Sequence, residues 1–308
     1  SDTGVGVHSI CLPHRVLRIS FPSSRHSLGQ MVRKNTKRVK GHRRGAPLSR
    51  LTGGPEQRGV ALEEEGLDLH KEISVRTDWA DLLGAPPRNL VARRVRGLEV
   101  WLVRGLLSAD ECAALTQRSE VHGFGPTDFV KSYRGNLRLT ATDRGLSEAI
   151  WKRLRLLVPT TLELKAPSPV TEESWWSSYP DADGTWEACG LNACWRLAKY
   201  HPGDRFMCHC DGAFEKVAGS EMSMLTANIY LNTGFGGGNT RFYLSDDPYF
   251  EWRSDFGKPD FEVVPEAGLC LLFRQPPGRT YWHDGEELSS GQKYLLRSDV
   301  MYRKRRGT

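Results

Sequence analysis

The C-terminal half of the chain limits the possible folds most strongly. From Asn192 to Tyr302, short runs rich in β-branched and aromatic residues are separated by clusters of Gly, Pro, Asp and Asn. Such runs between turn-forming clusters predict antiparallel strands. The pattern therefore predicts a mainly β fold, an antiparallel barrel or jelly roll, over residues 190–303. The runs are NACWRLAKY, MSMLTANIYLN, TRFYL, FEVVP, GLCLLF and KYLLRSDVMY.

Two helices are expected before these strands. LEVWLVRGLL (98–107) predicts a strand, after which Ser108 predicts the start of a helix. Ser108 and Glu111 match the capping box, in which each side chain accepts a hydrogen bond from the other residue's backbone amide. Apolar residues at helical spacing predict a second helix over 146–158, which ends before Pro159.

These helices look like scaffold for the β half, so we expect residues 95–165 to provide helical support. Residues 160–190 contain several Pro and Gly and predict a loop. Trp175 and Trp176 lie on this segment. A cover for the sheet is the favoured interpretation of the two rings, and contact with a substrate is the alternative.

The N-terminal part of the chain is strongly basic. Residues 1–55 hold eleven of the 43 Lys and Arg but one of the 37 acids, Asp2, so the remainder carries a net charge of about −4. Residues 1–70 also lack sustained apolar periodicity, which predicts a disordered tail. An acid-poor composition rich in Arg and Ser also suits an organellar targeting segment.

The cysteines indicate the compartment. Seven cysteines occur, without a C-x-x-C pair or the regular spacing of a disulfide framework, which favours a reducing environment. No apolar run approaches the roughly 18 residues that span a bilayer, so no membrane span is expected. We expect an intracellular protein, in the cytoplasm first, with organelle import or the nucleus as alternatives raised by the basic tail.

The sequence H-C-D at 209–211 contains two candidate metal ligands. On an extended strand His209 and Asp211 share one face, while Cys210 points to the other. His283, in YWHDG, lies at the end of a later predicted strand and supplies a possible third ligand. Two imidazoles and one carboxylate form the facial triad of non-haem iron(II) oxygenases. For Cys208 and Cys210, buried structural thiols are favoured over a zinc site.

Two cations follow the last candidate ligand. Lys293 comes ten positions after His283, and its ammonium group can pair with the distal carboxylate of a dicarboxylic co-substrate. Strand alternation places Lys293, Leu295 and Arg297 on one face. Arg297 is therefore a second candidate anchor.

Polar residues mark the inner face of the strand at 222–232. Thr226, Asn228 and Tyr230 alternate along it, and polar groups on an inner wall need hydrogen-bonding partners. We expect Asn228 and Tyr230 to contact the co-substrate. Half-buried packing is the alternative for Tyr230.

Two segments between the predicted strands have a composition typical of loops. GFGGGNTRFY (234–243) suggests a phosphate-binding loop, but no helix start follows it, so a tight β turn is expected. Residues 246–260 are polar and aromatic and are a candidate substrate lid.

Six motifs occur in an order that resembles the prolyl 4-hydroxylase-like group of the 2-oxoglutarate/Fe(II)-dependent dioxygenase superfamily. They cover about residues 190–303, and L-S-A-D-E-C-A-A-L resembles the helix before the barrel, so 95–303 is expected to be one catalytic domain. The resemblance implies a double-stranded β-helix, a jelly-roll or cupin-like core, with N-terminal supporting helices. The motifs are YHPGDRFMCHCDG, TANIYLN, GGGNTRFY, VVPEAGLCLLF, WHDG and SGQKYLLRSDVMY.

The resemblance also assigns roles to residues. It implies that His209, Asp211 and His283 bind Fe(II), and that Lys293 binds the C5 carboxylate of 2-oxoglutarate. Tyr200 and Tyr230 correspond to tyrosines that line or hydrogen-bond the co-substrate. Relatives often carry Tyr three positions before the first ligand, where this chain has Phe206, so a hydroxyl contact is lost there.

The implied activity is hydroxylation of an unactivated C–H bond with release of succinate and CO2. The cofactors and co-substrates would be Fe(II), 2-oxoglutarate and O2, with L-ascorbate as the reductant. A prolyl residue in a protein or peptide is the favoured substrate.

Other classes of function stay open. The basic tail and RKRR (303–306) suggest a nucleic-acid-binding protein or an oxidative demethylase, although the acidic remainder argues against a phosphate-binding groove on the domain itself. A non-catalytic metal-binding barrel is a further alternative. The sequence leaves open the substrate and regiochemistry, the compartment, the oligomeric state, the role of the tail and whether the chain is a fragment.

Overall fold

The computed structural model describes residues 73–305, apart from 169, 171–174, 248–249, 251–252 and 254. The predicted disordered tail, residues 1–70, therefore lies outside the described residues. So do parts of the candidate lid at 246–260 and the last residue of the RKRR segment.

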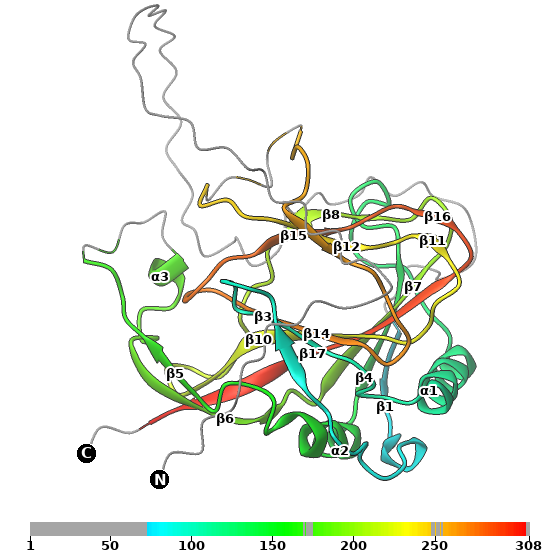
Figure 1. Ribbon diagram of the computed structural model, residues 1–308, viewed down its shortest axis with the longest axis horizontal. Helices are drawn as coiled ribbons and strands as arrows, with labels where there is room; N and C mark the ends of the chain where they lie inside the picture. Colours follow the sequence, from blue (N-terminus) through cyan, green and yellow to red (C-terminus); the bar gives the residue numbers. More distant parts are fainter. Residues whose placement is uncertain are drawn as a thin grey trace, which may run out of the picture.

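Two facing sheets form the body of the protein (Figure 1). Within the described residues, the larger sheet has eleven strands, with the main order β1-β4-β7-β17-β10-β14-β3-β2. The strands β5 and β6 extend it beside β17, and β9 pairs with β10. The smaller sheet has the order β13-β12-β15-β8, and β11 and β16 form a separate ribbon.

The larger sheet contains β1 (Ile73–Arg76), β2 (Ala92–Arg94), β3 (Val100–Val103), β4 (Leu137–Thr142), β5 (Thr161–Leu164), β6 (Gly184–Leu191), β7 (Cys194–Tyr200), β9 (Glu215–Val217), β10 (Glu221–Tyr230), β14 (Cys270–Arg274) and β17 (Lys293–Lys304). The smaller sheet contains β8 (Phe206–His209), β12 (Thr240–Tyr243), β13 (Phe261–Val263) and β15 (Trp282–Gly285). The ribbon contains β11 (Gly236–Gly237) and β16 (Leu288–Ser290).

From β7 onward the chain crosses repeatedly between the two sheets. Strands β7, β10, β14 and β17 lie in the larger sheet, and β8, β12, β13 and β15 lie in the smaller one. All pairs among these strands are antiparallel. This winding is a double-stranded β-helix, so the predicted fold class is confirmed.

Strand β10 shows how the sequence specifies the two layers. All ten of its residues are buried, because both faces of the strand are covered. Leu225, Ala227 and Ile229 pack in the core beneath the helices. Tyr230 packs between the two sheets, with Phe242 of β12 and other rings. Alternation along β10 therefore separates an apolar face from a face that points between the sheets.

Two helices cover the outer face of the larger sheet, as the sequence predicted (Figure 1). Helix α1 (Ala109–His122) begins with the expected capping box between Ser108 and Glu111. Helix α2 (Arg144–Leu154) begins earlier than predicted because the Asp143 side chain accepts a hydrogen bond from the Leu146 amide. It also ends earlier, in a turn that precedes Pro159. Leu115 of α1 and Ile150 of α2 are fully buried against the sheet.

The described chain contains two further short helices, η2 (Ala80–Leu82) and α3 (Trp175–Ser178). Among the residues described, none of the helices combines the length and the apolarity needed to cross a membrane.

In the support region, one expectation was wrong and one predicted strand is confirmed but shorter. Residues 160–190 are not a loop, because β5 and β6 pair there and β6 continues the larger sheet beside β17. The predicted strand at 98–107 is shorter, since Gly105 adopts a positive φ of 66° and turns the chain toward α1.

The support region is also less helical than expected and begins earlier. Strand β4 lies between α1 and α2 and pairs with β7. Strands β1 and β2, which precede residue 95, pair with β4 and β3 and so belong to the same sheet. Trp176 packs partly buried against the main core, in keeping with the favoured covering role.

A buried ion pair joins the two helices. Both terminal guanidinium nitrogens of Arg153 donate to the Glu111 carboxylate, at 2.7 and 2.8 Å, and the two side chains are 1% and 9% exposed. The Glu111 carboxylate also accepts from the backbone amides of Ser108 and Gly84. The hydrogen bond from Arg153 lowers the pKa of Glu111 to about 2.

We expect Glu111→Ala to lower the free energy of unfolding by about 3–5 kcal/mol, because it leaves the Arg153 charge buried and removes the capping box. The matched control is Glu266→Ala, whose ion pair with Arg104 is about half exposed, and it should cost less than about 1 kcal/mol. Urea unfolding near neutral pH measures both losses.

The sign of the pH dependence follows from the depressed pKa of Glu111. Its stabilising contribution should be complete above about pH 4.5 and should disappear as the pH falls toward 2. Equal losses for Glu111→Ala and Glu266→Ala at neutral pH would contradict this account.

Candidate metal centre

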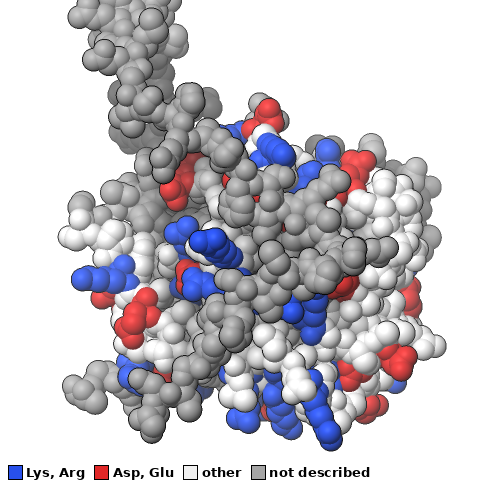
Figure 2. Space-filling view, viewed as in Figure 1, with Lys and Arg blue, Asp and Glu red and all other residues white. Residues whose placement is uncertain are grey.

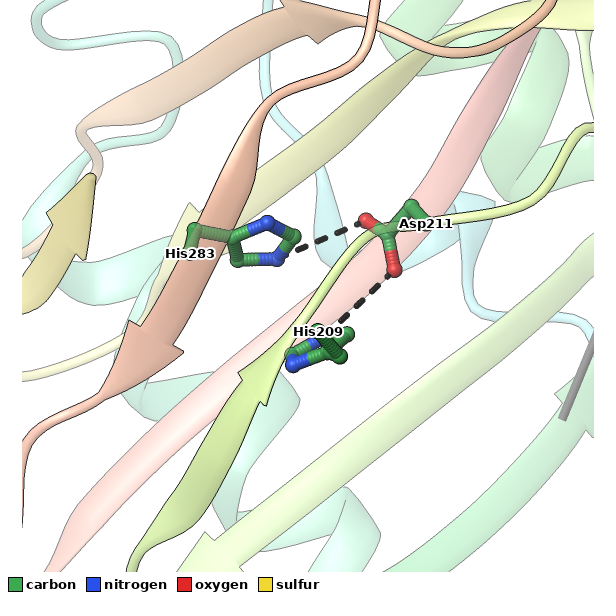
Figure 3. Close-up of side chains that lie close together, drawn as sticks. All are labelled: His209, Asp211 and His283. Carbon is green, nitrogen blue, oxygen red and sulfur yellow. Dashed lines mark ion pairs between the residues drawn. The ribbon is translucent and has the colours of Figure 1, made fainter. Parts of the chain in front are cut away.

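Three side chains from separate parts of the chain meet between the sheets. His209 ends β8, Asp211 follows it, and His283 lies on β15. Strands β8 and β15 are antiparallel neighbours, with His283 directly opposite His209. One ligand atom from each residue lies within 4.8 Å of the other two. Figure 3 shows both imidazoles beside the Asp211 carboxylate.

The two imidazoles are held in the same way. Nδ1 of His209 lies 2.8 Å from the Met207 carbonyl oxygen, and Nδ1 of His283 lies 3.0 Å from the Tyr281 carbonyl oxygen. A carbonyl oxygen only accepts, so each Nδ1 carries a proton and the neutral ring has an unprotonated Nε2. The Nε2 atoms lie 3.7 and 3.8 Å from the Asp211 oxygens.

The electrostatics of the cluster favour the protonation states that a metal requires. Burial lowers the pKa of His209 well below its usual value, and the neighbouring His283 lowers it further. Burial would raise the pKa of Asp211, but the charge of Arg297 and the hydrogen bond from Thr226 hold it well below its ordinary range. A neutral imidazole and an ionised carboxylate are the forms that bind a metal ion.

A hydrogen-bond network fixes the Asp211 carboxylate. Thr226 donates its hydroxyl to Oδ2 at 2.7 Å, and the Arg297 guanidinium lies 3.1 Å from Oδ1. Behind Thr226, the buried amide of Gln275 donates to the Thr226 hydroxyl and to Asp299, both at 2.9 Å. Such contacts behind a ligand orient it and tune its affinity for metal.

Aromatic rings enclose the imidazoles. Phe206 stacks on His209 with ring centres 3.7 Å apart, at the position where a tyrosine hydroxyl was expected to be lost. Phe242 and Phe273 lie 5.6 and 4.8 Å from the His283 ring. These rings limit the movement of both imidazoles and keep water from their faces.

The cluster opens into a cavity of about 370 Å³. Lys293 lines the cavity and is 2% exposed. Its ammonium group donates to the Gly238 carbonyl at 2.6 Å and lies 5.1 Å from the centre of the Tyr200 ring. Within the described part of the chain, Lys293 forms no ion pair with a carboxylate closer than 4 Å. Burial lowers its pKa to about 8.

The other predicted co-substrate residues are divided between the cavity wall and the layer behind it. Tyr200, Asn228 and Arg297 line the cavity. Tyr230 does not, because it is fully buried and its hydroxyl shares a 2.7 Å hydrogen bond with Thr240, which does line the cavity. Oδ1 of Asn228 is a buried acceptor that has no hydrogen-bonding partner among the residues that the structure describes.

The glycine-rich segment closes the lysine end of the cavity. Gly236 and Gly237 form the short strand β11, so the segment is more than the tight turn expected. Gly238 has a φ of 72°, and a Cβ atom there would lie 3.3 Å from Lys293 Cδ. A larger residue at this position would therefore disturb the lysine.

The cysteines beside the cluster pack against aromatic rings. Cys208 packs with Tyr243, Phe250 and Trp282, and the partly buried Cys210 contacts the same group and also lines the cavity. The described cysteines form no disulfide. Among the residues that the structure describes, His209, Asp211 and His283 are the group placed to hold a metal, and no cysteine belongs to it.

The comparisons with known proteins give structural neighbours. No protein-family model matches the chain, and no curated protein matches it. It is similar to the viral collagen prolyl hydroxylase of Paramecium Bursaria Chlorella virus-1, with 18% identity over 67% of this chain and 97% of that chain and a TM-score of 0.40.

Two further structures show the same likeness. A prolyl-4-hydroxylase from Pseudomonas putida is 20% identical over 68% of this chain and 95% of that chain, with a TM-score of 0.41. A Trichoplax adhaerens prolyl hydroxylase, in complex with a hypoxia inducible factor peptide fragment, is 16% identical over 68% of this chain and 84% of that chain, with a TM-score of 0.42.

If the cluster holds a divalent metal, His209→Ala and His283→Ala should each weaken metal binding by a hundredfold or more, because each removes a ligand atom. The matched control is His201→Ala, since His201 is partly exposed and lies outside the cluster. Equilibrium titration of the metal-free protein with Fe²⁺ under anaerobic conditions, or with Mn²⁺, measures the effect. Equal affinity in all three variants would contradict the assignment.

Proposed function

We propose that this protein is an Fe(II)- and 2-oxoglutarate-dependent dioxygenase that hydroxylates an unactivated C–H bond and releases succinate and CO2. One observation carries the proposal. Two histidines and an aspartate converge in a cavity that also contains a buried lysine, which has no carboxylate partner among the described residues.

The three side chains fit iron(II). They supply two imidazole nitrogens and one carboxylate oxygen, the donor set of the facial triad. When bound, iron(II) together with O2 and 2-oxoglutarate supplies the oxidant for C–H hydroxylation. His209, Asp211 and His283 would hold the metal, and the carbonyl contacts at Nδ1 would keep both imidazoles in the ligating tautomer.

The cavity also fits a small dicarboxylate. Lys293 would bind one carboxylate, because its ammonium group has donor capacity beyond the single hydrogen bond to Gly238. Tyr200, Asn228 and Leu295 line the space around it. Asn228 contributes a buried oxygen that lacks a partner in the described part of the chain, as expected of a wall that contacts a polar ligand.

The remaining residues would position these groups and exclude water. Thr226 and Arg297 hold the Asp211 carboxylate, and Phe206 covers the His209 ring. A dry and rigid site keeps the reactive chemistry directed at the substrate.

For the substrate, we propose a prolyl residue in a protein or peptide, with L-ascorbate as the reductant. The six sequence motifs between about residues 190 and 303 support this choice. The intracellular location and the single catalytic domain over 95–303 stay predictions.

The proposed activity is tested by succinate formation. With Fe(II), 2-oxoglutarate, ascorbate and a library of proline-containing peptides, the parent chain should form succinate, and mass spectrometry should show peptides that gain one oxygen. His209→Ala should reduce both signals to background, and His201→Ala should keep them. A parent chain that binds metal but forms no succinate with any peptide would favour the non-catalytic barrel instead.

Binding of 2-oxoglutarate should weaken as the pH rises through the pKa of Lys293, about 8, since the ammonium charge is present below that pH and lost above it. Between about pH 7 and pH 9 we expect roughly a tenfold loss in affinity. Calorimetry on the Mn²⁺-loaded protein measures it. Lys293→Met should bind weakly at both pH values, and the same pH dependence in Lys293→Met would exclude the lysine as its cause.

A further inference from the structure

Four buried polar side chains form a cluster behind the candidate metal centre. Ser223, Thr226, Gln275 and Asp299 are each at most 2% exposed. On the face shown in Figure 2, outside the grey residues, basic and acidic side chains are interspersed. The four residues of this polar cluster, in contrast, are withdrawn from the surface. Buried polar groups lower stability unless they are hydrogen-bonded, so the partners of each group show what the cluster does.

The register of the larger sheet brings the polar cluster together. Thr226 of β10 is directly opposite Asp299 of β17 and, on its other side, opposite Phe273 of β14. Gln275 follows Phe273 by two residues, and its backbone amide donates to the Met224 carbonyl at 3.0 Å. Alternation and this register therefore place the Gln275 side chain on the face that carries Thr226 and Asp299.

Asp299 decides which way the Gln275 amide points. One amide atom of Gln275 lies 2.9 Å from Oδ1 of Asp299 and 2.9 Å from Oγ1 of Thr226. A carboxylate oxygen only accepts hydrogen bonds, so this amide atom is the nitrogen, which has two hydrogens to donate. The amide oxygen then faces the Ser223 hydroxyl, which donates to it at 2.7 Å. Both ends of the amide are thus engaged.

The orientation of Gln275 in turn fixes the single proton of the Thr226 hydroxyl. The hydroxyl oxygen accepts a hydrogen bond from Gln275, so its own proton is donated to Oδ2 of Asp211, 2.7 Å away. The Asp211 carboxylate only accepts, which agrees with this direction. Gln275 therefore acts on Asp211 through Thr226.

A second arm reaches the other oxygen of Asp211. The terminal nitrogen of Arg297 that lies 3.1 Å from Oδ1 of Asp211 also lies 3.4 Å from Oδ1 of Asp299. The same Asp299 oxygen accepts from Gln275, and Arg196 lies 3.5 Å from the other Asp299 oxygen. Gln275 therefore links both of the groups that hold the Asp211 carboxylate.

The far end of the polar cluster returns to the segment that carries Asp211. The backbone amide of Phe214 donates to the Ser223 hydroxyl, and the backbone amide of Ser223 donates to the Phe214 carbonyl, both at 2.8 Å. Phe214 follows Asp211 by three residues. The contacts thus form a closed ring, which runs along the chain from Asp211 to Phe214 and returns through Ser223, Gln275 and Thr226. Such a ring restrains the carboxylate and the backbone that carries it.

We propose that Gln275 is a positioning residue of the metal centre, which holds the Asp211 carboxylate in place before an ion binds. This inference rests on the proposed function, because it takes Asp211 as a metal ligand. The Asp211 oxygens lie 3.7 and 3.8 Å from the Nε2 atoms of the two histidines, beyond hydrogen-bond distance (Figure 3). Held by Thr226 and Arg297, the carboxylate faces both imidazoles without closing onto either.

The first variant is Gln275→Met, which keeps a side chain of similar length and removes the amide. The Thr226 hydroxyl can then rotate, and Asp299 loses one hydrogen bond, so the Asp211 carboxylate is held less firmly. We expect about a tenfold loss of affinity for Mn²⁺, as is typical when a residue that orients a metal ligand is replaced. Equilibrium titration of the metal-free full chain measures the loss.

The matched control for the loss of a buried hydrogen bond is Ser147→Ala. The Ser147 hydroxyl donates to the Asp143 carbonyl and accepts from the Trp195 indole, and these residues lie outside the cavity lining. The control should lower the free energy of unfolding and keep the affinity for Mn²⁺. Thr226→Ser keeps the hydroxyl and should keep most of the affinity, whereas Thr226→Val should lose affinity as Gln275→Met does.

Two readouts separate positioning from general destabilisation. Bound Co²⁺ has visible absorption bands that respond to the arrangement of its ligand atoms. These bands should change in Gln275→Met and in Thr226→Val, and should stay as in the parent chain in Ser147→Ala. In the Gln275→Met, Thr226→Val double variant, the loss of Mn²⁺ affinity should be smaller than the product of the two single losses, because Gln275 acts partly through Thr226.

A milder variant keeps the test decisive if Gln275→Met does not fold. Ser223→Ala removes the hydroxyl that donates to the Gln275 amide oxygen, and it should cause a smaller loss of Mn²⁺ affinity of the same sign. Parent affinity and parent Co²⁺ bands in the folded variants Gln275→Met and Ser223→Ala would overturn the positioning role. A double variant whose loss equals the product of the single losses would also overturn it.

Failure of the proposed function gives a different result. A parent chain whose Mn²⁺ affinity depends on Gln275, but which forms no succinate with iron, 2-oxoglutarate, O2 and any peptide, would support the positioning role and refute the activity. A parent chain that binds no Mn²⁺ would overturn both the metal centre and the role of Gln275.

Discussion

The pairing of β8 with β15 is the contact on which the site depends. It places His209 directly opposite His283, although the two residues are far apart in the sequence. Backbone hydrogen bonds between neighbouring strands fix that register, and a slip of one residue would turn one imidazole to the opposite face of the sheet. The stacked rings of Phe206 and Phe242 then hold the two imidazoles in place. The smaller sheet and these rings therefore fix the positions of both imidazoles.

The larger sheet supplies polar and charged side chains that surround the ligand residues. Strand β10 presents Thr226 to the Asp211 carboxylate, and β17 presents Arg297 to the same group and Lys293 to the other end of the cavity. Because both strands lie in the centre of the sheet and are packed beneath by the helices, these polar groups are fixed by the core. The fold thus separates two tasks, since ligand atoms come mainly from one layer and charges for anionic partners from the other.

Local sequence signals were reliable where one strand or one helix end decides the outcome. The capping box at Ser108 was visible because it needs only residues three positions apart. The shared face of His209 and Asp211, and that of Thr226, Asn228 and Tyr230, followed from alternation alone. Arg196 lies four residues before Tyr200 on the same strand, so alternation would also have predicted that Arg196 lines the cavity. No comparable local pattern marks Gln275 or Arg134. Strands β5 and β6 were missed because Pro and Gly around them resemble a loop, and their pairing with each other and with β17 is non-local.

The sequence by itself determined the β-rich fold class, the candidate ligands and the lysine, because residue type and a period of two are local properties. Only the tertiary structure decided that Tyr230 stands behind Thr240, that Thr226 and Gln275 support Asp211, and that Arg134 lies over Phe206 beside His209. Each of these contacts joins segments whose distance depends on the register and crossing of whole strands. That geometry is fixed when the two sheets pack together, and no single stretch of the chain encodes it.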